Sequence, residues 1–289
     1  MSLKNPKIPE GINASQENPL KEFFWLLLGV GISIIIFVAC ISYFAQVLSS
    51  YIPFEWEESW VSENLANQLA KKENDTFSTS DFEQAQSALE TILSDLQSKQ
   101  STPSKIKIHL IDSTIPNAFA TLGGHIFINT GLLPHIESEN GLAMVIAHEM
   151  AHVEHRHPIQ SLSRGLIIQL VSMMIFADNS VSSMLNQTSF LALLRYNRQM
   201  ESESDNTALI TLQNYYGHTE GAHEFFQSML NEKEGRMSIE FFNTHPDVDK
   251  RIHNIQKSMP LKAVSLTPLP APLAKLKEQA STLDLDIID

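Results

Sequence analysis

Two histidines and a glutamate form the motif His148-Glu-Met-Ala-His152. On a helix, positions i and i+4 share one face, so both imidazoles can reach one metal ion. Neutral imidazole nitrogens bind Zn²⁺ at about 2.0–2.1 Å, and Glu149 can reach a metal-bound water as a general base. The apolar run 142–147 before the motif indicates a buried helix, in which unpaired polar side chains would be costly. The alternative is a surface helix with two stray histidines, because so short a motif also occurs by chance.

A catalytic zinc site needs a third protein ligand and one open position. The pattern with a third histidine six residues after His152 is excluded, because His155 stands where it requires glycine. His155 itself lies about 10 Å along the helix from His148, too far for one ion. Glu201 is the better candidate, and Asp205, four residues later on a predicted helix, can hold a ligand histidine by its far N–H. A solvated acidic face is the alternative for both.

The composition narrows the classes of function. Among 289 residues there are 20 Lys and Arg against 33 Asp and Glu, a formal charge of −13. Nucleic-acid binding needs a basic surface and is therefore not expected. Cys40 is the single cysteine, so the chain can form neither an intramolecular disulfide nor a cysteine-based zinc finger. A metal must therefore be held by His and Glu.

No charged residue occurs between Phe23 and Leu48. About 20 apolar residues suffice for a helix to cross a bilayer, so this segment predicts a transmembrane signal anchor. A cleaved signal peptide is the alternative, but its apolar region is shorter and ends at a small-x-small site. Lysines precede the segment and glutamates follow it, which predicts a cytoplasmic N-terminus and residues 49–289 outside the cytoplasm. The charges are Lys4, Lys7 and Lys21 before, and Glu55, Glu57 and Glu58 after.

The remaining patterns predict an α+β fold that is mostly helical with a small β-sheet. Strands are expected at 105–112 and on both sides of Gly123-Gly124 within 116–130. The apolar stretch 166–176 is too short to span a bilayer and is expected to pack over the helix of the HExxH motif, with a lid or a membrane-surface contact as the less favoured interpretation. Helices are expected at 56–72, 79–100, 138–157, 161–177, 187–212, 220–232 and 246–258.

The chain resembles the HtpX-like and CaaX-prenyl-protease-like family of membrane-associated zinc metallopeptidases, gluzincins with an HExxH motif and a later Glu. The resemblance covers roughly residues 105–258 and departs from the family pattern at Gly141, usually Glu, and at Ser204, usually Ala. The chain has one predicted span, as in a single-anchor or periplasmic branch. The matching pieces are Asn117-Ala-Phe-Ala, Gly123-Gly124-x-Ile-Phe-Ile, Gly131-Leu-Leu, Ser138-Glu-Asn, His148-Glu-x-x-His-Val-x-x-Arg-His157, Glu201-x-Glu-x-Asp205 and Thr244-His-Pro-x-x-x-x-Arg-Ile252.

This resemblance implies a zincin-like domain with one Zn²⁺ per chain. Its ligands would be His148, His152 and Glu201, its base Glu149, and Asp205 would support a ligand. The domain division is then 1–22 cytoplasmic tail, 23–48 anchor, 49–104 helical linker and N-terminal part of the catalytic domain, 105–260 metallopeptidase domain and 261–289 C-terminal tail, expected to be weakly ordered.

The activity expected is peptide-bond hydrolysis by a membrane-anchored zinc metalloendopeptidase. Its substrates would be unfolded or misassembled envelope proteins, its location the bacterial inner membrane facing the periplasm, with the mitochondrial inner membrane as the alternative. A zinc-containing protein that holds clients like a chaperone, without proteolysis, is the alternative function. His245 or Arg251 can stabilise the oxyanion. His245 can instead occupy the open metal position and hold the enzyme inactive, and Thr244 to Pro246 can simply begin a helix.

Overall fold

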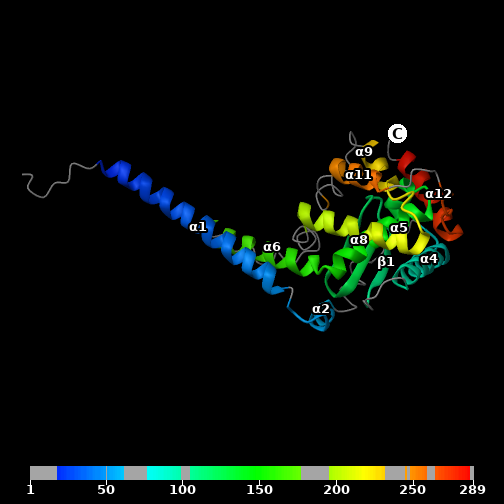
Figure 1. Cartoon of the computed structure of the whole chain (residues 1–289), viewed down its shortest axis with the longest axis horizontal. Helices are drawn as coiled ribbons and strands as arrows, with labels where there is room; N and C mark the ends of the chain where they lie inside the picture. The colour runs from blue at the N-terminus through cyan, green and yellow to red at the C-terminus, as the bar shows by residue number, and fades with distance from the viewer. Residues whose placement is uncertain are drawn as a thin grey trace, which may run out of the picture.

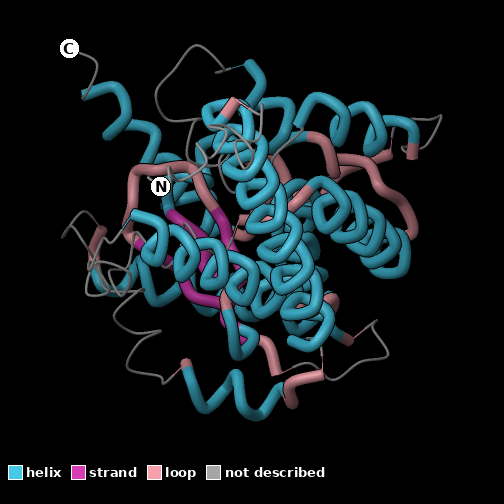
Figure 2. Tube along the Cα trace, turned by 90° about the vertical axis from the view of Figure 1, so that its left-hand side faces the viewer, coloured by secondary structure: helices cyan, strands magenta, loops and turns pink. Residues whose placement is uncertain are grey.

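The computed structural model describes residues 18–49, 51–61, 77–98, 105–176, 195–231, 245, 248–258 and 264–286. Helices α1 (Pro19–Ser49) and α6 (His157–Phe176) project side by side from a mainly helical domain (Figure 1), and a small sheet lies within that domain (Figure 2), so the expected α+β class is confirmed. The parts of predicted helices at 62–72, 99–100, 187–194, 232 and 246–247 lie outside the described residues. The helices are α1 Pro19–Ser49, α2 Phe54–Trp60, α4 Thr79–Gln97, α5 Glu139–Glu154, α6 His157–Phe176, α8 Arg198–Tyr216, α9 Glu224–Asn231, α11 Val248–Lys257 and α12 Ala271–Asp286.

The sheet has three strands in the order β1-β3-β2, namely β1 Lys107–Ile111, β3 His125–Asn129 and β2 Ala118–Ala120. β1 is parallel to β3, and β2 is antiparallel to it. The turn between β2 and β3 is a short 3-10 helix, Leu122–Gly124. Gly124 has φ +77°, and a Cβ there would lie 2.7 Å from the Lys105 carbonyl oxygen, so the turn requires glycine. The predicted pair of strands around Gly123-Gly124 is confirmed, and β2 lies at an edge of the sheet.

Helix α5 is the buried centre of the domain. Every residue from Asn140 to Val153 is buried, and α5 packs between α8, α4 and the sheet. Its N-terminus is capped by Ser138, whose Oγ accepts from the N–H of Gly141 at 3.1 Å. Glu224 of α9 accepts from the Ser138 N–H at 2.9 Å and hydroxyl at 2.8 Å. A Cβ on Gly141 would lie 2.3 Å from Glu224 Oε2. Glu224 therefore supplies the carboxylate that a glutamate at 141 would otherwise bring to this cap.

The C-terminal region differs from the expected weakly ordered tail. Residues 271–286 form α12, which packs against α4 and the 3-10 helix η2, Thr130–His135. Leu273 and Leu276 are fully buried. Before α12, the Thr267 carbonyl accepts from Glu139 N–H at 2.9 Å, at the first turn of α5. The prolines of this region lie between secondary-structure elements. Helix α12 is ordered because its apolar face packs against the core of the domain.

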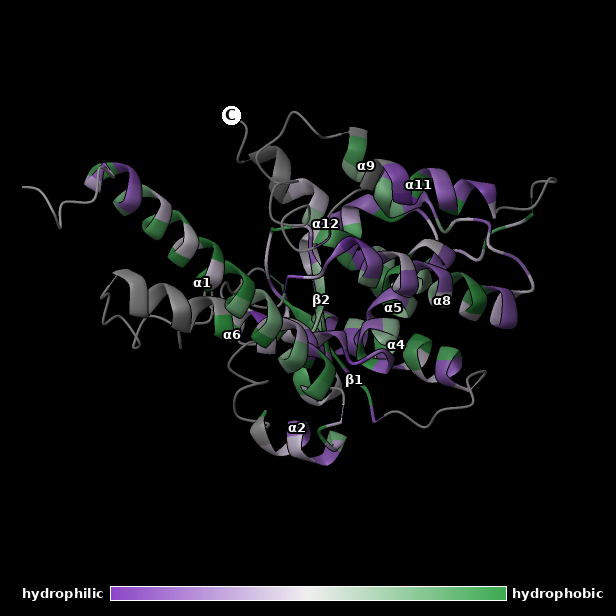
Figure 3. Cartoon of the chain, turned by 60° about the vertical axis from the view of Figure 1, so that its left-hand side comes forward, coloured by the Kyte–Doolittle hydropathy of each residue, from purple (hydrophilic) through white to green (hydrophobic). Residues whose placement is uncertain are grey.

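Helix α6 also differs from its expected position. It was expected to pack over α5, but it runs along α1 instead (Figure 1). Between α5 and α6, Arg156 adopts a left-handed conformation with φ +59°, which turns the chain away from α5. Helix α1 has 31 residues and is long and apolar enough to cross a membrane. Along most of α1 the residues are apolar, and hydrophilic residues gather at its N-terminal end (Figure 3).

Candidate metal centre

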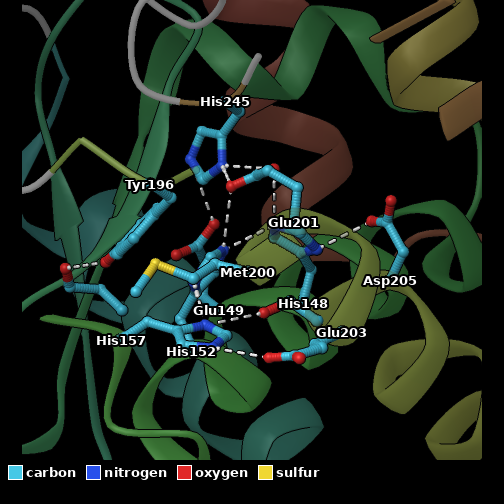
Figure 4. Close-up of polar contacts among 12 residues, drawn as sticks. His148, Glu149, His152, His157, Tyr196, Met200, Glu201, Glu203, Asp205 and His245 are labelled. Carbon is cyan, nitrogen blue, oxygen red and sulfur yellow. Dashed lines mark hydrogen bonds and ion pairs between the residues drawn. The ribbon is translucent and has the colours of Figure 1, made fainter. Parts of the chain in front are cut away.

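Four buried side chains from three parts of the chain converge at one point. α5 contributes His148 and His152, α8 contributes Glu201, and His245 precedes α11 (Figure 4). One ligand atom from each residue lies within 4.8 Å of the other three. All four are at most 3% exposed. The structure thus brings together the three predicted ligands and adds His245 as a fourth donor.

The two histidines of α5 present the same nitrogen to this point. His148 Nε2 and His152 Nε2 lie 3.0 Å apart. The far nitrogen of each ring has its own partner: His148 Nδ1 lies 3.0 Å from Asp205 Oδ1, and His152 Nδ1 lies 2.9 Å from His157 Nδ1. A carboxylate that accepts from Nδ1–H leaves the Nε2 lone pair for a metal. Two Nε2 atoms this close, on rings whose far nitrogens have other partners, are placed as two ligands of one metal ion would be.

Arg251 pairs with both carboxylates of α8. Its Nε and Nη2 each donate to Asp205 at 2.7 Å, and its Nη1 lies 2.5 Å from Glu201 Oε2. Burial alone would raise the pKa of Asp205, but the Arg251 charge outweighs it and lowers that pKa to about 2. Burial likewise opposes ionisation of Glu201, and Arg251 and His245 keep its pKa well below the usual value. Both carboxylates are therefore ionised where a cation would be held.

Glu149 differs from Glu201 in its surroundings. It is 1% exposed, and its Oε2 has no hydrogen-bond partner within the described part of the chain. Its Oε1 lies 3.7 Å from His245 Nε2. Burial raises the pKa of Glu149, which brings it toward the range in which a carboxylate exchanges protons near neutral pH. An unpaired oxygen beside the ligand group suits a base that acts on a water molecule.

The edge strand β2 borders this group. Its Phe119 pairs with Phe127 of β3, so the backbone of the two flanking alanines faces away from the sheet. The Ala118 carbonyl lies 3.3 Å from His245 Nε2, and the Ala120 carbonyl accepts from the Tyr196 hydroxyl at 3.0 Å. The outer edge of β2 therefore lies beside the metal ligands and is buried, with side-chain partners on both alanine carbonyls.

The sequence profile of peptidase family M48 matches residues 83–259, more than half of the chain. The chain belongs to peptidase family M48. Members of this family depend on zinc, and the donor set His-His-Glu fits that metal. The match begins in α4 and ends after α11, so it includes every residue of the group of four.

Two groups of relatives match this M48 chain. The mitochondrial metalloendopeptidase OMA1 of Schizosaccharomyces pombe is 32% identical over 160 residues, which cover 54% of this chain and 47% of that protein. The Escherichia coli beta-barrel assembly-enhancing protease is 26% identical over 156 residues, which cover 50% of this chain and 32% of that protein. The matched part thus spans about half the length of the yeast protein and a third of the bacterial one.

Two residues of the M48 site were missed from the sequence. Tyr196 is 5% exposed, and its ring stacks on the His152 imidazole. His157 is 2% exposed and contacts His152 on the opposite side from the metal ligands. Their signal is their position: Tyr196 comes just before the Asn197 cap of α8, and His157 ends the run HExxHVxxRH. His155, set aside as a ligand, lies 2.8 Å from the Thr207 hydroxyl and outside the group of four.

Proposed function

We propose that this protein is a membrane-anchored zinc metalloendopeptidase that binds one Zn²⁺ per chain through His148, His152 and Glu201. The observation that carries the proposal is the buried group of these ligands with Glu149 beside it, whose Oε2 has no hydrogen-bond partner among the described residues. Membership of peptidase family M48 supports the same reaction class. Client holding without proteolysis, the alternative, gives no reason to bury an unpaired carboxylate next to a metal site.

When bound, zinc supplies Lewis-acid polarisation of the scissile carbonyl and lowers the pKa of a water. Glu149 takes a proton from that water through its unpaired carboxylate oxygen and passes it to the nitrogen of the leaving amine. Asp205 orients His148 by accepting from its Nδ1–H. Arg251 is held by Glu201 and Asp205, and we therefore assign it a positioning role in place of direct oxyanion stabilisation.

His245 has two roles open to it in this proposal. Its Nδ1 lies 3.2 Å from Glu201, and its Nε2 lies toward Glu149 and the Ala118 carbonyl. A catalytic zinc keeps one position free for water or substrate. His245 lies among the four residues that could bind one ion, which supports its occupying that free position and keeping substrate out. His245→Asn should raise the basal rate if the ring closes the site, and lower kcat if the ring stabilises the oxyanion.

Extended, unfolded or misassembled proteins are the proposed substrates. An exposed edge strand binds peptide backbone without regard to side-chain sequence. The outer edge of β2 borders the metal ligands, and a substrate would pair there by displacing His245 and Tyr196 from the Ala118 and Ala120 carbonyls. We place the protein in the single-anchor branch that resembles the HtpX-like enzymes, with α1 as the anchor, a cytoplasmic N-terminus and the catalytic domain on the other side. The proposed membrane is the bacterial inner membrane, and the names of the OMA1 relatives support a mitochondrial membrane as the alternative. The proposed catalytic unit covers 105–260 together with α12.

The test uses the full chain in lipid nanodiscs with unfolded casein as the substrate. Zinc per chain and the cleavage rate are measured for the wild type and for Glu149→Gln. The mutant should keep its zinc and lose about 10²–10⁴-fold in rate, the usual contribution of a general base. Glu83→Gln, at an exposed position of α4, is the matched control and should cleave normally. A Glu149→Gln protein that cleaves casein at the wild-type rate would refute the mechanism.

A further inference from the structure

Helix α6 lies antiparallel to α1 along the half of α1 that is nearer the domain. Its N-terminal end lies in the domain, where His157 is buried, and its C-terminal end lies out along α1 (Figure 1). Near the domain the two helices are joined by a side-chain hydrogen bond in which Gln46 Nε2 donates to Gln160 Oε1 at 3.3 Å. This hydrogen bond shows which residues of the two helices lie side by side.

The register places the apolar end of α6 beside the middle of the predicted anchor. Because the helices are antiparallel and Gln160 lies level with Gln46, Leu166 lies level with about Cys40, six residues further along each helix. The stretch 166–176 extends about 16 Å at 1.5 Å per residue. That length is about half of the hydrocarbon core, which is about 30 Å thick. The stretch therefore matches one leaflet and not a full span.

The charges of α6 stop at Arg164, which lies level with about Ser42, inside the uncharged segment 23–48 of α1. Arg164 is the last charged residue of the helix, and its Nη2 donates to the Arg195 carbonyl at 2.9 Å, at the domain end. Beyond it the sequence LIIQLVSMMIF carries no charge. Leu166, where this sequence begins, is 39% exposed. The composition of this stretch favours an apolar medium over water.

We propose that α6 enters the lipid bilayer beside α1, and that residues 166–176 lie in the hydrocarbon core at the level of about residues 30–40 of α1. The inference rests on the proposed role of α1 as a membrane anchor, because α6 runs alongside α1. The partner is the acyl-chain region of the bilayer. His157, the first residue of α6, contacts the ligand His152, so this second helix places the metal site close to the membrane surface. The enzyme would therefore bind its substrates at the membrane surface.

The experiment uses single cysteines in the full chain, reconstituted in nanodiscs. The native Cys40 reports α1. In a Cys40→Ala background, Leu166→Cys and Met174→Cys report α6, and Ile210→Cys, 61% exposed on α8, is the water-facing control. Two quantities are measured for each: the rate of reaction with a membrane-impermeant maleimide, and the quenching of an attached fluorophore by lipids that carry a spin label on the acyl chain.

We expect both α6 cysteines to react more slowly than the one at 210, by about tenfold for each unit that an apolar medium raises the thiol pKa. The fluorophores on α6 should be quenched by the labelled lipids, and the one at 210 should not. If the α6 cysteines react as fast as the one at 210 while Cys40 stays protected, the inference fails and the anchor stands. If Cys40 also reacts fast, both fail. Slow reaction without lipid quenching means that protein covers α6, which also overturns the inference.

Discussion

The ring of Tyr196 lies nearly parallel to the imidazole of His152, with 3.7 Å between ring centroids and 18° between planes. The hydroxyl of the same tyrosine donates to the Ala120 carbonyl on the outer edge of β2. One side chain therefore connects a metal ligand to the strand that would bind substrate. Its ring and its hydroxyl can be tested separately.

Tyr196→Phe keeps the stacked ring and frees the Ala120 carbonyl. If a substrate N–H pairs with that carbonyl, KM should fall by about 2–10-fold, the value of one hydrogen bond, with zinc affinity unchanged. Tyr196→Ala removes the ring as well and should weaken zinc binding and lower the free energy of unfolding by about 3–5 kcal/mol. Peptide kinetics and zinc titration measure these effects. A loss of kcat at constant KM in Tyr196→Phe would instead assign the hydroxyl to oxyanion stabilisation.

Glu201 and Glu203 are two residues apart on α8 and should differ in zinc binding. Glu201 is 1% exposed in the group of four, whereas the side chain of Glu203 is 45% exposed. Removing a residue that hydrogen-bonds to a metal ligand lowers zinc affinity by about 10–100-fold. Glu201→Gln removes a ligand itself, so its zinc affinity should fall by more than that. The loss in Asp205→Asn should lie within that range, and Glu203→Gln should cost less than Asp205→Asn, because Glu203 reaches His152 only through His157. Competition with a fluorescent zinc chelator gives the affinities. Equal affinities for the two Gln variants would exclude Glu201 as a ligand.

Glu57 and Glu58 offer a matched pair at the junction between the anchor and the domain. Glu57 is 3% exposed, accepts from Arg156 Nε at 2.9 Å and also lies 3.3 Å from the Gly123 N–H. Glu58 pairs with Lys105 at the surface. Breaking the buried pair with Glu57→Gln should cost about 3 kcal/mol, and Glu58→Gln less than about 1 kcal/mol. Urea unfolding followed by tryptophan fluorescence reports this, because Trp56 and Trp60 lie in α2. Equal urea midpoints for the two variants would mean that the Glu57–Arg156 pair does not stabilise the fold.

His135 should make the protein less stable in mild acid. Burial lowers the pKa of His135 to about 4, and the charge of Lys277 adds to the effect. Because the unfolded chain binds this proton near pH 6.5 and the folded one only near pH 4, stability falls as the pH falls through that window. The loss is about 2 kcal/mol at pH 5 relative to pH 8. His135→Gln should flatten the pH dependence of the unfolding free energy, while His253→Gln, on an exposed face of α11, should not.

Leu276 tests whether α12 belongs to the domain. It is fully buried, and Leu276→Ala should lower the free energy of unfolding by about 2–5 kcal/mol through the cavity it leaves. Thr282→Ala, at an exposed position of the same helix, should change it by less than about 0.5 kcal/mol. Thermal unfolding by circular dichroism distinguishes the two. If both variants unfold at the same temperature as the wild type, α12 contributes nothing to the stability of the fold.

Local patterns were enough to predict the HExxH helix, the two strands around Gly123-Gly124 and the uncharged segment 23–48. Each depends on neighbours along the chain: i and i+4 on one helix face, glycine at a turn, and an uninterrupted apolar run. The same reasoning brought His148, His152 and Glu201 forward, because the residue types suit zinc and α8 was expected to be helical. Their convergence is a tertiary fact, since α5 and α8 must pack side by side to bring Glu201 to the histidines.

Other features were decided by contacts between segments far apart in the sequence. Gly141 departs from the family pattern because Glu224, 83 residues later, occupies the space and the capping role. Helix α12 is ordered by the core that receives its leucines, and α6 follows α1 because the chain turns at Arg156. The sequence by itself determined which residues can bind a metal and which segment can enter a bilayer, since these depend on residue chemistry and local period. Only packing decided their partners, because burial is a property of surfaces that meet in three dimensions.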